Sequence, residues 1–78
     1  MEFIETRMEE DPSKHTRFIL FYTEFIEFLK EKRLRPMTKI MVGKALKNEG
    51  FQVKGRRTED ENGEEIQTTC VFGVKFSI

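Results

Sequence analysis

The chain has 78 residues, of which 37% are hydrophobic and 36% charged, and its 14 basic residues balance 14 acidic ones. This length allows one small domain, and eight Phe residues suffice for a compact core, which argues against disorder. One cysteine, Cys70, and one histidine, His15, exclude a multi-cysteine zinc site and a two-histidine metal or catalytic arrangement. We therefore expect no catalytic residues, no metal and no cofactor, in a reducing, cytoplasmic setting.

The neutral total conceals a strong charge pattern. Residues 30–57 carry ten bases and two acids, whereas residues 58–65 carry five acids and no base. The basic middle third indicates a surface that faces a polyanion, and a solvated face neutralised by the acidic segments is the alternative. We expect no membrane partner, because no apolar stretch approaches the ~20 residues of a membrane span. The acidic N-terminal segment is also unlike a secretory leader.

The first half of the chain predicts two helices. Residues 1–12 are expected to contain a short first helix, broken at Asp11-Pro12 because the residue before proline avoids the helical region. A long helix is predicted over 13–34, with Ser13 as its candidate N-cap. Its apolar stripe includes Phe18, Phe21, Tyr22, Phe25 and Leu29. We expect this stripe to form the core, with Phe18 and Phe28 as its most exposed rings.

A third, basic helix is predicted over 38–49. Thr38 is its expected N-cap and Gly50 its expected C-terminal glycine. Its apolar face is expected to contain Met41, Val42, Ala45 and Leu46. Gly43 costs roughly 1 kcal/mol relative to alanine inside a helix, so we expect it to let another helix approach closely.

From Phe51 the hydrophobic period changes to two. This predicts a β-hairpin over 51–78 with its turn at Asn62-Gly63. Gly73 suggests a bulge or a close backbone contact within the second strand, and Cys70 is expected to be a small buried side chain. The β-forming residues of that strand are Ile66, Val71, Phe72, Val74, Phe76 and Ile78.

The chain is therefore expected to be a single α+β domain spanning 1–78, a winged helix-turn-helix with three helices followed by a C-terminal β-hairpin wing. Five short motifs between Phe21 and Phe76 carry a resemblance to known families. They are Tyr22 with Phe25; Pro36-Met37-Thr38; Val42-Gly43-Lys44-Ala45-Leu46; Gly50-Phe51; and Phe72-Gly73-Val74-Lys75-Phe76. The basic strand residues Lys54, Arg56 and Arg57 belong to the same resemblance.

In this order the motifs resemble the C-terminal winged-helix module of phage- and poxvirus-like primase–helicases, and they are similar to the DNA-binding domain of regulatory-factor-X transcription factors. The resemblance implies a non-catalytic DNA-binding module of DNA replication, from a phage or mobile element, whose ATPase and primase parts lie elsewhere. No phosphate-binding loop of the G-x-x-x-x-G-K-(S/T) type is present. The hairpin tip departs from the basic wing of regulatory-factor-X domains, because its five acids would be repelled by phosphate.

The candidate DNA-binding residues are basic or polar and come from the predicted third helix, its approach and the first strand. They are Arg35, Thr38, Lys39, Lys44, Lys47, Asn48, Lys54, Arg56 and Arg57. The helix lysines are expected to meet phosphates of duplex or forked DNA, and the strand bases to extend the contact. About six phosphate contacts would give log K against log salt a slope near −5.

Two alternatives remain open at this point. The helix lysines are equally typical of a solvated face, and Arg56 and Arg57 are expected to be masked if they pair across the strands with Glu64 or Glu65. The alternative function is a protein-interaction module that uses the acidic segment 58–65 and exposed aromatic residues to dock other domains or proteins of a replication complex. Winged helices serve in both ways, so the fold does not decide between them.

Overall fold

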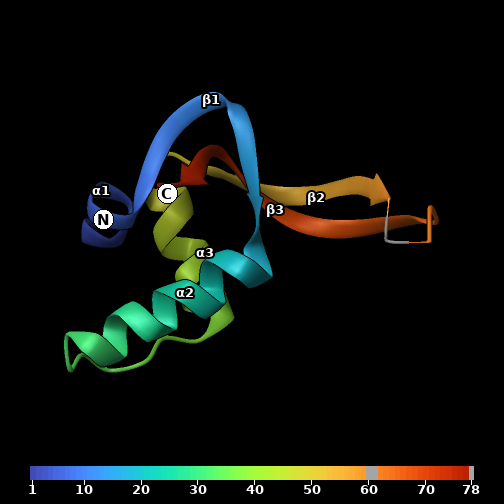
Figure 1. Cartoon of the computed structure of the whole chain (residues 1–78). Helices are drawn as coiled ribbons and strands as arrows, with labels where there is room; N and C mark the ends of the chain where they lie inside the picture. The colour runs from blue at the N-terminus through green and yellow to red at the C-terminus, as the bar shows by residue number, and fades with distance from the viewer. Residues whose placement is uncertain (60–61, 78) are drawn as a thin grey trace.

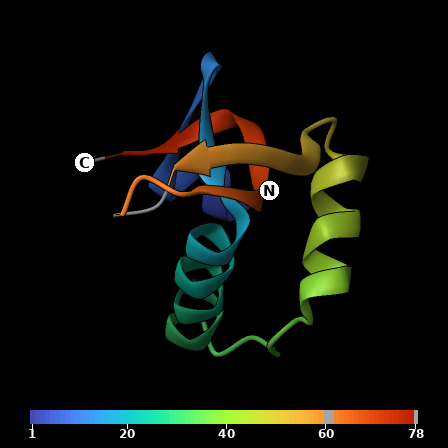
Figure 2. The same cartoon turned by 90° about the vertical axis from the view of Figure 1, so that its right-hand side faces the viewer.

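The computed structural model describes residues 1–59 and 62–77, and this part of the chain is an α+β domain with three helices and a three-stranded antiparallel sheet (Figure 1). The elements are α1 (Glu2–Arg7), β1 (Met8–Arg17), α2 (Phe18–Glu31), α3 (Lys39–Asn48), β2 (Gln52–Glu59) and β3 (Glu65–Phe76). Strand β3 lies between β1 and β2. Figure 2 shows α2 and α3 on one side of the sheet, joined at the end farthest from it.

Strand β1 replaces the helical turns predicted over 1–12 and 13–34. The first helix ends at Arg7 and α2 begins only at Phe18, so the segment between them is extended. Ser13 is not an N-cap: its backbone N–H and its hydroxyl donate to one Asp11 carboxylate oxygen, at 3.0 and 2.7 Å. Pro12 is tolerated because β1 is an edge strand whose pairing with β3 is interrupted at this point.

Helix α2 also ends earlier than the predicted boundary at residue 34. Its last residue is Glu31, and Arg33 follows with a positive φ of 57°. The Leu34 N–H donates to the Leu29 carbonyl at 2.9 Å, which is the long bond of a Schellman motif. Arg33 therefore occupies the left-handed position that glycine usually fills, and the helix stops without the help of the later proline.

Both ends of α3 agree with the prediction. The Thr38 hydroxyl accepts a hydrogen bond from the Met41 N–H at 3.2 Å, which makes Thr38 the N-cap. Gly50 has φ 95° and ends the helix. The expectation for Gly43 is wrong, because nothing lies within 4 Å of a Cβ built at this residue.

The core is centred on Phe3 of α1, which inserts into the apolar stripe of α2. Its ring centroid lies 5.2 Å from that of Phe21 and 5.3 Å from those of Phe25 and Phe28. Phe28 was expected to be among the most exposed rings, but it is buried beneath α1. Phe18 is half-buried, as expected. A short first helix therefore completes the core that α2 begins.

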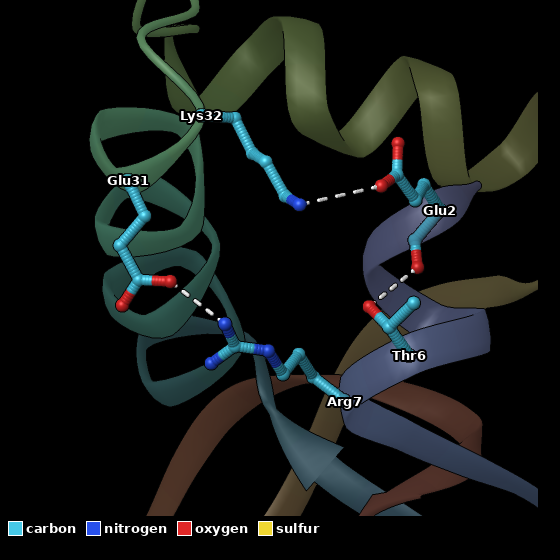
Figure 3. Close-up of polar contacts among 5 residues, drawn as sticks. All are labelled: Glu2, Thr6, Arg7, Glu31 and Lys32. Atoms are coloured by element: carbon cyan, nitrogen blue, oxygen red, sulfur yellow. Dashed lines mark hydrogen bonds and ion pairs between the residues drawn. The ribbon is translucent and has the colours of Figure 1, made fainter.

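Charged side chains close the edge of this core. Arg7 of α1 pairs with Glu31 at 2.7 Å, and Lys32 approaches Glu2 at 3.9 Å (Figure 3). The same two cations lie over the Phe28 ring, 5.6 and 5.7 Å from its centroid. The α1 helix is thus held against the C-terminal end of α2 by both apolar and ionic contacts.

A bulge interrupts the pairing of β1 with β3. Glu10 pairs with Val74 and His15 pairs with Phe72, so residues 11–14 lie opposite Gly73 alone. Gly73 has φ 90°, which confirms the predicted bulge. Strict alternation would place Phe72 on the same face as Val74 and Phe76. Because of the bulge, Phe72 lies on the opposite face.

The hairpin is confirmed over its described part. Strands β2 and β3 pair in one continuous register from Gln52 opposite Phe72 to Glu59 opposite Glu65. Gly63 has φ 78° in the turn region between them. The structure describes only part of the acidic tip, because Asp60 and Glu61 lie outside the described residues. Ile78, which was predicted in the second strand, also lies outside them.

Removing the Phe3 ring should be strongly destabilising, because it would leave a cavity against three other rings. We expect Phe3→Ala to lower the free energy of unfolding by roughly 3–5 kcal/mol. Leu34→Ala is the control: this side chain is 55% exposed, and its loss should change stability by less than about 0.5 kcal/mol. Urea unfolding measures both, and similar midpoints for the two variants would contradict this arrangement of the core.

Two glycine-to-alanine changes should have opposite signs. Gly73→Ala places a Cβ at a positive φ and should cost about 1 kcal/mol or more. Gly43→Ala should stabilise by up to about 1 kcal/mol, because it adds helix propensity in open space. Thermal unfolding of the two variants gives the comparison, and a stabilised Gly73→Ala protein would rule out the bulge.

Candidate nucleic-acid interface

The outward face of α3 is basic and aliphatic. Val42 and Leu46 are fully buried, and the helical repeat places Lys44 directly opposite them. Four exposed side chains flank Lys44 on this face: Ile40, Met41, Lys47 and Asn48. Within residues 1–59 and 62–77, neither Lys44 nor Lys47 has an ion-pair partner. Met41 was predicted in the apolar face, but it is 51% exposed, and Ile40 is 72% exposed.

Lys39 and Thr38 lie outside this face. The Lys39 ammonium lies 5.8 Å from the centre of the Tyr22 ring, so it is turned toward α2. The hydroxyl of Tyr22 donates to the Met37 carbonyl at 2.7 Å, which fixes the connection that leads into α3. Thr38 uses its hydroxyl as the helix cap. Arg35, in the same connection, is exposed.

The bases of β2 are divided between the two faces of the sheet. Val53 packs against the core opposite the buried Val71. Because side chains alternate along a strand, Arg57 lies on the helix side with Val53, whereas Lys54 and Arg56 lie on the opposite side. The predicted stripe of three strand bases is therefore not continuous.

The predicted masking of the arginines by the hairpin acids is weak where the structure describes it. Arg57 approaches Glu65 at 4.0 Å, and these side chains are 82% and 72% exposed. An exposed pair at this distance contributes little stability. Arg56 instead contacts the ring of His15, with 2.6 Å between its guanidinium and Nδ1. Arg57 thus remains accessible to a partner.

Sequence reasoning missed two ring-bearing residues beside the strand bases. Phe72 was predicted only as a β-forming residue of its strand, and His15 lay in the helix predicted over 13–34. The structure places both next to Lys54 and Arg56 on the sheet face away from the helices. The signal that could have found Phe72 was Gly73, since a bulge there changes which residues share a face.

These lysine and arginine side chains support the binding of an anionic partner. No cluster of His, Cys, Asp and Glu suited to a metal ion occurs among the described residues. No helix in that part of the chain has the length and apolar character to span a bilayer. A scan against protein-family models and a search of curated proteins find no match to this chain.

His15 should titrate below the ordinary histidine range. Desolvation by the surrounding protein lowers its pKa first, and the charges of Arg56 and Lys14 lower it further. The folded state therefore binds fewer protons than the unfolded state as the pH falls through about 6.5, so stability should decrease there. NMR titration should give a pKa below 6.5, and Arg56→Gln should raise it.

The same shift should appear in stability. Between about pH 7 and about pH 5, the urea midpoint should fall further for the wild type than for His15→Gln, which lacks this group. The difference isolates His15 from the carboxylates, because both proteins contain all of them. Parallel pH profiles would contradict a lowered pKa at His15.

Proposed function

We propose that this chain is a non-catalytic DNA-binding module of the winged-helix type, in which α3 contacts the phosphates of duplex or forked DNA. The observation that carries the proposal is the outward face of α3, where Lys44 and Lys47 are exposed opposite the buried Val42 and Leu46 and have no ion-pair partner in the described part of the chain. Unpaired lysines on one helix face lose little when they bind phosphate, because no internal ion pair is broken.

The surrounding fold supports this proposal. A winged helix requires a helix pair joined by a short connection and followed by a hairpin, and α2, α3, β2 and β3 supply these elements. The Tyr22–Met37 hydrogen bond ties the connection that leads into α3 to the side of α2. The resemblance to primase–helicase modules adds the proposal that the chain serves DNA replication in a phage or mobile element, in a cytoplasmic setting.

The proposed mechanism is mainly electrostatic. Lys44 and Lys47 meet the DNA backbone, with Arg35 as the nearest further base on the connection to α3. Three phosphate contacts would give a slope of about −3 for log K against log salt, because each duplex contact contributes about −0.9. Ile40 and Met41, in the first turn, are placed where recognition helices contact base edges, and aliphatic groups suit thymine methyls.

A second candidate is the protein-interaction module, and one observation favours it. Ile40 and Met41 are exposed aliphatic side chains, 72% and 51% accessible, on a helix face that also carries cations. Exposed aromatic residues do not support it, because every Phe and Tyr of the chain is buried or half-buried. A partner would therefore dock on the aliphatic turn of α3.

The test is a titration of the full chain into labelled duplex and forked DNA of about 20 base pairs at several salt concentrations. We expect Lys44→Glu/Lys47→Glu to weaken binding at least about tenfold at low salt and to reduce the salt slope by about 2. Fluorescence anisotropy measures both quantities.

The matched control carries the same charge change at the end of α2, as Lys30→Glu/Arg33→Glu. This variant should retain most of the binding, because these bases lie outside the outward face of α3. Equal losses of DNA affinity in the two variants would show that only the net charge of the protein matters, which would contradict a role for the α3 face. If the wild type does not bind DNA even at low salt, the proposal fails and the protein-interaction candidate takes its place.

A further inference from the structure

A second surface, separate from α3, has the chemistry of a binding site. Three residues pair across the sheet as Thr16, Val71 and Val53, and their side chains face the core. The adjacent rows are His15–Phe72–Gln52 and Arg17–Cys70–Lys54, so alternation places them on the opposite face. We call these two rows, together with Arg56, the outer face of the sheet.

Two rings lie at the centre of the outer face with a cation beside each. The Phe72 and His15 centroids are 5.6 Å apart, with their planes inclined by 32°. The Lys54 ammonium lies 5.2 Å from the Phe72 centroid, and Arg56 contacts His15. The outer face therefore contains both flat rings and positive charges. They lie on three strands, and the register of these strands fixes their spacing.

The charge of this face is largely unmatched. Beside His15 a shallow depression is lined by Lys14, Arg17 and Lys75, and also by Thr16, Leu20 and Phe76 from the helix side of the sheet. Lys75 pairs with Glu9 at 3.5 Å. Lys14, Arg17, Lys54 and Arg56 are exposed. Lys14 acts electrostatically on the Asp11 carboxylate, whereas within the described ranges no carboxylate forms a salt bridge with Arg17, Lys54 or Arg56. These positive charges repel a protonated His15, because Arg56 and Lys14 both lower its pKa.

We propose that the outer face binds single-stranded DNA. Its phosphates would meet Lys54, Arg56 and Arg17, and its unpaired bases would stack on His15 and Phe72, with the flexible Lys54 side chain moving aside. Aromatic residues interleaved with bases are how proteins hold single strands without reading their sequence. Duplex DNA suits this face less, because its bases are already stacked inside the helix. The surface lies apart from α3, so the inference does not depend on duplex binding.

The probe is labelled oligo(dT) of about 12 nucleotides, added to the full chain at low salt. We expect Phe72→Leu, which keeps an apolar side chain but removes the ring, to weaken binding about tenfold. Lys54→Gln/Arg56→Gln should reduce the slope of log K against log salt by about 1.4, because each single-strand contact contributes about −0.7. Anisotropy gives the affinities, and circular dichroism verifies that each variant is folded.

The α3 variant Lys44→Glu/Lys47→Glu is the matched control, since it should weaken duplex binding at least about tenfold and keep oligo(dT) binding within about twofold of the wild type. If Phe72→Leu does not fold, the exposed His15→Gln variant replaces it, with an expected loss of several-fold. The inference is overturned if oligo(dT) does not bind, if removing either ring leaves affinity unchanged, or if the α3 variant abolishes single-strand binding. Equal competition by polyglutamate would also overturn it, because an acidic peptide does not use the rings.

Discussion

The bulge at Gly73, where β1 and β3 change register, determines which side chains of the sheet point toward the core. Without it, regular alternation would place Val71 and Val74 on opposite faces of β3. With it, both valines are fully buried against the helices, and Phe72 between them is turned to the other side. One irregularity therefore completes the core and turns a half-buried ring to the outer face. The outer face of the sheet depends on this division.

The core in turn determines how α3 is displayed. Phe3 and the rings of α2 fill the space between the helices and the sheet, and α3 contributes only Val42 and Leu46 to it. A helix that buries so narrow a stripe leaves most of its circumference accessible. The Tyr22 hydrogen bond and the Thr38 cap then fix where α3 begins. The protein thus offers a helix face and a sheet face that point in different directions.

Local signals explain what the sequence predicts correctly. Thr38 and Gly50 define α3 by capping chemistry, and the period of two defines the hairpin. Strand β1 was missed because only Met8 and Thr16 of its ten residues are buried, so it has no alternation to detect. Its pairing with β3 comes from residues far away in the chain, as does the position of Phe72. The α3 lysines could be predicted from a helical repeat, but the division of the β2 bases required the sheet.

Cys70 gives the sheet a built-in reporter. Its thiol is fully buried in the central strand, between Arg17 of β1 and Lys54 of β2. Because its row belongs to the outer face, a thiol reagent can reach it once the neighbouring side chains of that face move aside or a strand separates. As the single cysteine of the chain, it makes the rate of labelling a measure of how often the outer face opens. A ligand that spans the three strands would slow that reaction, whereas one held by α3 alone would leave it unchanged.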